Sequence, residues 1–102
     1  MKTYNKLVRD LIPQIIEATG QTPVTRNLTD KEYITELKRK LQEETNEYLE
    51  SGEIMELCDI IEVVYALSEA TDVGIDELHL LREKKAEANG KFKQKIYLES
   101  VF

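Results

Sequence analysis

Two long segments with the period of an amphipathic helix constrain the fold of this 102-residue chain most strongly. The first begins at Thr29 or Asp30, which are both good N-cap residues, and ends at Ser51-Gly52. The second occupies about residues 53–71. A short connection makes two helices antiparallel neighbours, so the sequence predicts a helical hairpin at the centre of an all-α domain.

Shorter elements flank this hairpin. They are a helix over residues 10–19 with Asp10 as its N-cap, a loop or extended stretch over 21–27, a helix over 76–88 with Asp76 as its N-cap, and an extended tail or strand over 91–102. The tail has a weak period-two pattern and could pair with the stretch around Val24. The predicted fold is therefore a bundle of about four helices with an extended C-terminal tail, in one domain over residues 1–102.

Length and composition exclude several classes of protein. A chain of this length can bury a core, but short chains often complete their core by oligomerising. The single cysteine, Cys58, excludes an internal disulfide and a cysteine-based zinc site. No apolar run approaches the ~18 residues of a membrane span, and the opening MKTYNKLVRD lacks the apolar stretch of a signal peptide. We expect a cytoplasmic protein with no membrane partner.

Charge is unevenly distributed along the chain. The formal net charge is −6, which argues against a nucleic-acid partner because phosphate neutralisation requires a contiguous basic face. Acidic residues dominate between Asp30 and Glu62, whereas basic residues dominate between Arg82 and Lys95. This distribution favours a cation site together with a site for a polyanion.

Acidic residues interrupt the apolar stripe of the first long helix. At about 100° per residue, the stripe contains Tyr33, Ile34, Leu37, Leu41 and Tyr48. Glu44 falls inside it, Glu47 lies at its margin, and Glu43 lies off it. The first long helix is therefore expected to turn at least one carboxylate towards its packing partner.

The second long helix repeats this arrangement. Its apolar face is centred on Leu57, Ile60, Ile61, Val64 and Leu67, with Val63 on one flank. Glu56 lies between Val63 and Leu67, and Asp59 borders the same flank at a spacing of i and i+3 from Glu56. Each helix of the hairpin thus aims a pair of carboxylates at or beside the surface through which the two helices pack.

Four carboxylates in such a place require neutralisation. Each desolvated carboxylate loses several kcal/mol of hydration, and like charges repel one another. Only Lys40 lies near enough to the stripes to pair with them, so a bound cation is the simpler explanation. Oxygen ligands without His or Cys select Mg²⁺, or Mn²⁺, over Zn²⁺. The alternative is a solvated helix face with surface salt bridges.

The acidic pattern resembles a known signature. Glu43-Glu44-x-x-Glu47 followed by Glu56-x-x-Asp59 is similar to the EExxE and ExxD motifs of the MazG-like, all-α nucleoside triphosphate pyrophosphohydrolases. The opening YNKLVRDLIP, residues 4–13, resembles the YNKLVRDKIP start of one subgroup, which is related to phosphoribosyl-ATP pyrophosphohydrolases. The likeness runs over nearly the whole chain and includes residues 22–26 and Gly90-x-Phe92. Leu11 stands in place of a lysine, which removes one basic group that could meet phosphate.

The resemblance implies a site and a reaction. Mg²⁺ would be held by Glu44, Glu47, Glu56 and Asp59, and hydrolysis between the α and β phosphates would give a monophosphate and pyrophosphate. Glu47 or Glu43 would orient or deprotonate the attacking water. We expect the phosphate contacts to come from Arg9, Lys84, Lys91 and Lys95, each of which could instead belong to a basic solvent-exposed surface.

The resemblance also implies a homo-oligomer, a dimer or a tetramer, with helices packing across subunits. Two alternatives to a nucleoside triphosphate pyrophosphohydrolase stay open. The substrate could be phosphoribosyl-ATP or another phosphorylated metabolite, because base and sugar specificity depend on pocket shape. The chain could also be a non-catalytic helical assembly or regulatory module.

Overall fold

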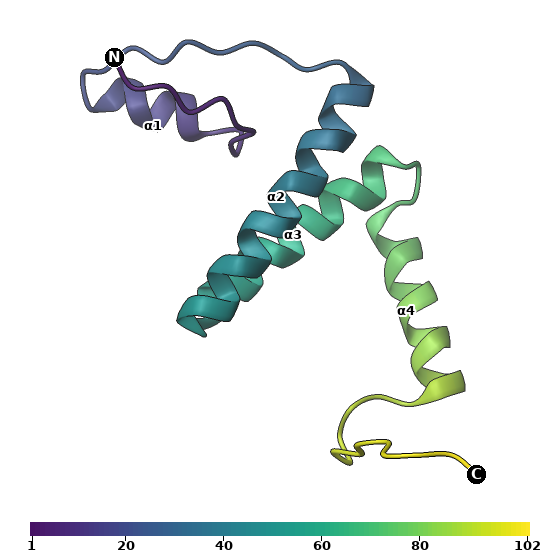
Figure 1. The fold of residues 1–102 in the computed structure, drawn as a ribbon. Helices are drawn as coiled ribbons and strands as arrows, with labels where there is room; N and C mark the ends of the chain where they lie inside the picture. The colour runs from purple at the N-terminus through teal and green to yellow at the C-terminus, as the bar shows by residue number, and fades with distance from the viewer.

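The computed structural model describes residues 1–102 and contains four α-helices and no β-strand (Figure 1). The helices are α1 (Ile12–Ala18), α2 (Asp30–Ser51), α3 (Ile54–Ala70) and α4 (Ile75–Asn89). An extended tail follows α4. The predicted all-α class with about four helices and an extended C-terminal tail is therefore confirmed.

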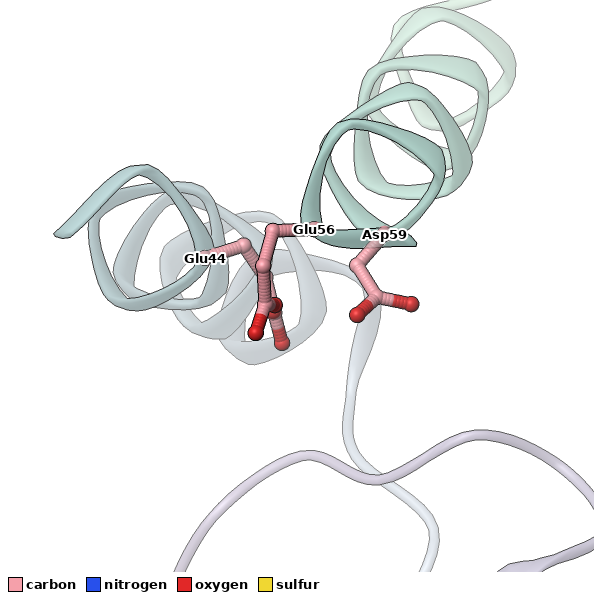
Figure 2. Close-up of side chains that lie close together, drawn as sticks. All are labelled: Glu44, Glu56 and Asp59. Atoms are coloured by element: carbon pink, nitrogen blue, oxygen red, sulfur yellow. The ribbon is translucent and has the colours of Figure 1, made fainter. Parts of the chain in front are cut away.

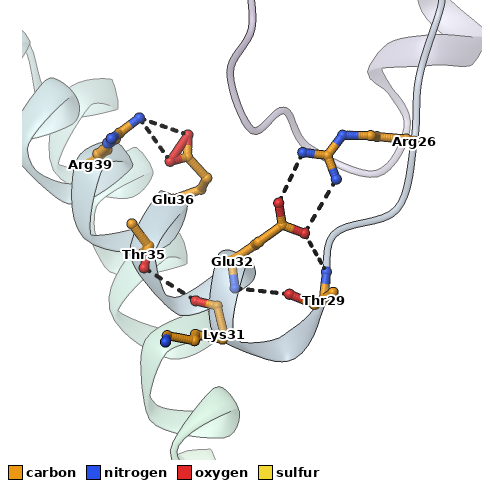
Figure 3. Close-up of polar contacts among 7 residues, drawn as sticks. All are labelled: Arg26, Thr29, Lys31, Glu32, Thr35, Glu36 and Arg39. Atoms are coloured by element: carbon orange, nitrogen blue, oxygen red, sulfur yellow. Dashed lines mark hydrogen bonds and ion pairs between the residues drawn. The ribbon is translucent and has the colours of Figure 1, made fainter.

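Local signals define both ends of α2. The backbone N–H of Glu32 donates to Thr29 Oγ1 at 3.2 Å, and the backbone N–H of Thr29 donates to Glu32 Oε1 at 3.0 Å, which makes a capping box (Figure 3). Arg26 contacts the same carboxylate and helps to lower the pKa of Glu32 to about 2. At the other end Gly52 adopts φ +67°, a left-handed conformation that glycine accepts without strain.

The core lies between α2 and α3, which form the predicted hairpin. Leu37 of α2 and Val63 of α3 are its buried apolar residues. By contrast, α4 contacts only α3, and α1 packs against no other helix. The molecule is correspondingly extended, with a radius of gyration of 18.0 Å against about 13 Å for a compact chain of this length.

α3 turns a different side towards α2 than its apolar pattern predicted. Ile61, at the centre of the predicted face, is 48% exposed, whereas Val63 from the flank is buried. The apolar face of α3 is wider than one helix can cover, and α2 covers the flank that carries Glu56 and Asp59. The packing therefore rotates α3 towards its acidic flank: Leu57, Ile60, Val64 and Leu67 stay half-buried, and Ile61 is the one central residue that is exposed.

Two predicted N-caps are wrong. Asp10 does not cap α1, because the backbone N–H of Ile12 already donates to Arg9 O at 3.1 Å and Pro13 has no N–H to offer. Asp76 lies in the first turn of α4, whose N-cap is Gly74. There its charge still complements the positive end of the helix dipole.

The C-terminal tail forms no strand and does not pair with the stretch around Val24. Every residue from 91 to 102 is exposed. A period-two pattern alone does not make a strand, because the backbone groups of a strand need a neighbouring strand as partner. The tail therefore matches the extended alternative of the prediction and not the strand.

Large apolar side chains remain exposed along the helices. They include Leu49, Ile54, Met55, Ile61, Leu80 and Leu81. Apolar surface of this kind on a small domain commonly marks a surface that another molecule covers. None of the four helices has an apolar stretch sufficient to traverse a lipid bilayer.

Candidate metal centre

Three of the four predicted carboxylate ligands converge at the α2–α3 interface. Glu44 comes from α2, and Glu56 and Asp59 come from successive turns of α3 (Figure 2). Each offers one oxygen, and the three oxygens lie within 4.8 Å of one another. The i and i+3 spacing on α3 places both of its carboxylates on the flank that packs against α2. We refer to these three residues as the acidic cluster.

Glu44 is the buried member of the acidic cluster. It is only 7% exposed, as its place inside the apolar stripe predicted. Its Oε1 atom lies 3.5 Å from Lys40 Nζ, whereas its Oε2 atom is buried and has no hydrogen-bond partner. A buried acceptor without a partner costs free energy, and more so when it is charged. A divalent cation held by the cluster would supply the missing partner, so the residues present fit such an ion.

The pKa of Glu44 also indicates negative charge that nearby basic residues do not compensate. Burial is the main cause that raises the pKa of Glu44. The neighbouring Glu47 raises this pKa further, by accepting a hydrogen bond from the protonated form and by repelling the charged one, and Asp59 adds a smaller repulsion. Lys40 acts in the opposite direction. One lysine does not balance the negative charge that surrounds Glu44.

The two proposed water-orienting residues have different surroundings. Glu47 is exposed, one turn after Glu44, and does not belong to the three oxygens that lie within 4.8 Å of one another. Glu43 contacts two lysines, Lys6 Nζ at 3.4 Å and Lys40 Nζ at 3.5 Å. Glu47 therefore borders the acidic cluster without a basic partner, whereas Glu43 is engaged in ion pairs.

The N-terminal segment, residues 1–10, supplies cations that the helical pattern did not reveal. Arg9 Nη2 lies 2.6 Å from Asp59 Oδ1, so its guanidinium meets a predicted metal ligand. Lys40 is the basic residue near the stripes of the two helices, as predicted, but Arg9 reaches Asp59 from outside them. The signal was the pair of basic residues in the opening YNKLVRD, but nothing local places this segment beside α3.

The other three predicted phosphate-binding residues lie elsewhere in the chain. Lys84 is exposed on α4, which contacts α3 alone. Lys91 and Lys95 belong to the exposed tail, which follows the end of α4 far from the turn between α2 and α3 (Figure 1). One chain therefore does not bring these lysines to its own acidic cluster. Their role in substrate binding stays a prediction.

An open cavity of about 540 Å³ lies along the part of α3 that follows Asp59, and no member of the acidic cluster lines it. Tyr33 of α2 and Tyr65 of α3 line it, together with the carboxylates of Asp10, Glu62 and Glu69. The hydroxyl of Tyr65 and Nε2 of His79 are 3.1 Å apart, which gives the single histidine a structural partner. Pockets for small molecules commonly have this volume and this mixture of aromatic and polar groups.

Comparison with known proteins gives one informative similarity. The chain is 55% identical over 42 residues to an uncharacterized protein of Mycolicibacterium smegmatis. The matched segment is 41% of this chain and 43% of that protein, so the chain spans less than half the length of this relative. No protein-family model and no solved structure matches the chain.

Proposed function

We propose that this protein is a Mg²⁺-dependent nucleotide pyrophosphohydrolase of the MazG-like type, which cleaves a nucleoside triphosphate into a monophosphate and pyrophosphate. The observation that carries the proposal is the acidic cluster, three carboxylate oxygens within 4.8 Å with an unpartnered, buried Glu44 Oε2 beside them. Such a set of hard oxygen ligands suits Mg²⁺, with Mn²⁺ as a close substitute. We place the enzyme in the cytoplasm, where its substrates are found.

Each acidic residue would have a separate role in the reaction. Glu44, Glu56 and Asp59 would hold the ion, which when bound supplies Lewis-acid chemistry at the phosphate oxygens and makes water a better nucleophile. Glu47 is exposed beside the cluster, is paired with no basic residue, and would orient the attacking water and take its proton. Glu43 is the weaker candidate for that role, because it is paired with two lysines.

The cavity along α3 would receive the nucleoside. It begins one turn beyond Asp59, so a phosphate at the acidic cluster would leave the sugar and base directed along α3. Tyr33 and Tyr65 offer aromatic faces against which a base could stack. The carboxylates of the same cavity accept hydrogen bonds only, which favours bases that present amino groups.

The remaining phosphate contacts would come from a second subunit. Lys84, Lys91 and Lys95 are exposed and lie on the part of the chain that extends from the hairpin. The exposed apolar side chains of α3 and α4 favour a homo-oligomer, a dimer or a tetramer, in which these lysines could reach the cluster of a neighbour. Substituting both tail lysines by Gln should then raise KM more than it lowers kcat.

The test is pyrophosphate release in the presence of Mg²⁺. Nucleoside triphosphates with canonical, deoxy and damaged bases and phosphoribosyl-ATP would be supplied to the parent, to Glu56→Gln, and to Glu50→Gln as the control. Glu50 is exposed on α2 and belongs to neither the acidic cluster nor the cavity. We expect release by the parent and by Glu50→Gln and none by Glu56→Gln. Full activity of Glu56→Gln would contradict the site, and preference for phosphoribosyl-ATP would favour the alternative substrate class.

A second candidate is a non-catalytic helical assembly module. Two observations favour it: Arg9 already neutralises Asp59, and large apolar side chains are exposed on α3 and α4. A purely structural bundle should gain no specific stability from millimolar Mg²⁺. No pyrophosphate from any of these substrates, together with no Mg²⁺-dependent rise in melting temperature, would select this candidate.

A further inference from the structure

The N-terminal segment is held to the hairpin by its basic residues. Arg9 Nη2 lies 2.6 Å from Asp59 Oδ1, and Lys6 Nζ lies 3.4 Å from Glu43 Oε1. The helix that follows, α1, packs against no other helix, so it does not fix the position of this segment. Ion pairs with acidic residues of α2 and α3 therefore contribute to its attachment, together with the half-buried Leu7 and Val8.

Arg9 and a metal ion would compete for the same charge. Asp59 contributes an oxygen to the acidic cluster and accepts the hydrogen bond from Arg9 through Oδ1. A guanidinium this close to a carboxylate ligand would lie within a few ångströms of a bound divalent cation. Like charges at that separation repel one another, although water weakens the repulsion because the side chains of Arg9 and Asp59 are 55% and 36% exposed. While Arg9 neutralises the Asp59 carboxylate, binding of a metal ion to that carboxylate is less favourable.

We propose that Arg9 is the built-in counter-cation of the metal-free acidic cluster, and that a divalent cation displaces it from Asp59 on binding. The inference rests on the proposed metal site. Displacement loosens the N-terminal segment and leaves the Arg9 guanidinium free beside the site, where an anionic phosphate group would meet it. The same arginine thus stabilises the empty cluster and becomes available to substrate only after the metal has bound.

The test is equilibrium binding of Mn²⁺ alone to the full, metal-stripped chain, followed by the electron paramagnetic resonance signal of free Mn²⁺. The variants are Arg9→Gln, Arg9→Lys and, as matched control, Arg26→Gln, which breaks an arginine–carboxylate pair at Glu32 away from the cluster. Arg9→Gln should bind Mn²⁺ about fivefold more tightly than the parent, the factor that corresponds to ~1 kcal/mol for an exposed ion pair. Arg9→Lys keeps the charge and should bind like the parent, as should Arg26→Gln.

Hydrogen exchange gives a second readout that does not depend on a variant. Saturating Mg²⁺ should speed amide exchange in residues 1–10 of the parent while slowing it in α2 and α3. Unchanged or weaker Mn²⁺ binding by Arg9→Gln, or slower exchange in residues 1–10 with Mg²⁺, would overturn the displacement of Arg9. Absence of Mn²⁺ binding to every variant, parent included, would overturn the metal site itself and with it the proposed function.

Discussion

Lys40 and Glu44 form an ion pair one helical turn apart on α2 that satisfies only one side of a buried carboxylate. Lys40 Nζ is 3.5 Å from Glu44 Oε1, whereas Glu44 Oε2 is buried without a partner. The lysine is also shared with Glu43, whose Oε2 lies 3.5 Å from the same nitrogen. The metal-free protein therefore carries an energetic penalty at Glu44 that either a proton or a cation would relieve.

The stability of the metal-free protein should fall as pH rises past the ordinary glutamate range. Burial raises the pKa of Glu44 above its reference value of 4.5, so the folded chain holds this proton to higher pH than the unfolded chain does. The stabilising contribution is complete below the unfolded pKa and is lost as pH rises through the folded one. We expect urea titrations in EDTA to show this loss in the parent.

Substituting Glu44 isolates its contribution to that profile. Glu44→Gln should remove the decline, because the side chain no longer ionises, whereas Glu62→Gln on the exposed side of α3 should keep it. A pH profile for Glu44→Gln that matches the parent would contradict this account.

Mg²⁺ should stabilise the protein through the acidic cluster. At a concentration 100-fold above its dissociation constant, the ion would add about 2.7 kcal/mol and raise the melting temperature by roughly 10–20 °C. Asp59→Asn and Glu56→Gln should each abolish most of this rise, and differential scanning fluorimetry over a Mg²⁺ series measures it. Glu62→Gln should respond like the parent, and an equal rise in Asp59→Asn would show that the ion binds elsewhere.

The capping box at Thr29 should contribute measurably to stability. Thr29→Ala removes the acceptor for the backbone N–H of Glu32 and should cost about 1 kcal/mol in chemical denaturation. Thr35 is the matched control, because its hydroxyl only donates to the carbonyl of Lys31 on the surface of the same helix (Figure 3). Thr35→Ala should change stability by less than about 0.5 kcal/mol. Equal losses in the two variants would contradict a specific role for the cap.

The exposed apolar side of α3 should mediate self-association. Ile61 is 48% exposed on α3, and Ile54 and Met55 of the same helix are also exposed. Ile61→Lys would place a charge in the interface and should raise the dissociation constant of the oligomer about tenfold or more. Sedimentation velocity over a concentration series measures this constant. Glu87→Lys on α4 introduces the same side chain at an exposed, already charged position and should leave assembly unchanged. A monomeric parent would contradict the prediction outright.

Local sequence signals account for the elements that were predicted correctly. The bounds of α2 follow from the cap at Thr29 and from the left-handed conformation of Gly52, and both depend on neighbours in the sequence. Asp10 and Asp76 do not act as N-caps because the first turns of α1 and α4 begin at other positions than predicted. The position of the first turn decides which backbone N–H groups a cap residue can accept from. Helix ends were therefore predictable where a single residue, such as Thr29 or Gly52, sets the local backbone conformation.

The candidate site was predictable only in part. Helical periodicity sufficed to place Glu44 inside and to put Glu56 and Asp59 on one flank of α3. It also placed this flank at or beside the packing surface, but it did not indicate that Ile61 would stay exposed, because several faces of a broad apolar helix compete for one partner. The exclusion of Glu47 from the three closest carboxylates likewise depends on the angle and depth at which the two helices pack.

The sequence by itself determined the helices, the hairpin and the inward position of Glu44, since each follows from spacing within about one or two turns of helix. Only the tertiary structure decided that Arg9 meets Asp59, fifty residues later in the chain. It also decided that Lys84, Lys91 and Lys95 lie apart from the acidic cluster of their own chain. Contacts between remote segments depend on how whole elements pack. The helical period within one segment does not determine how that segment packs against another.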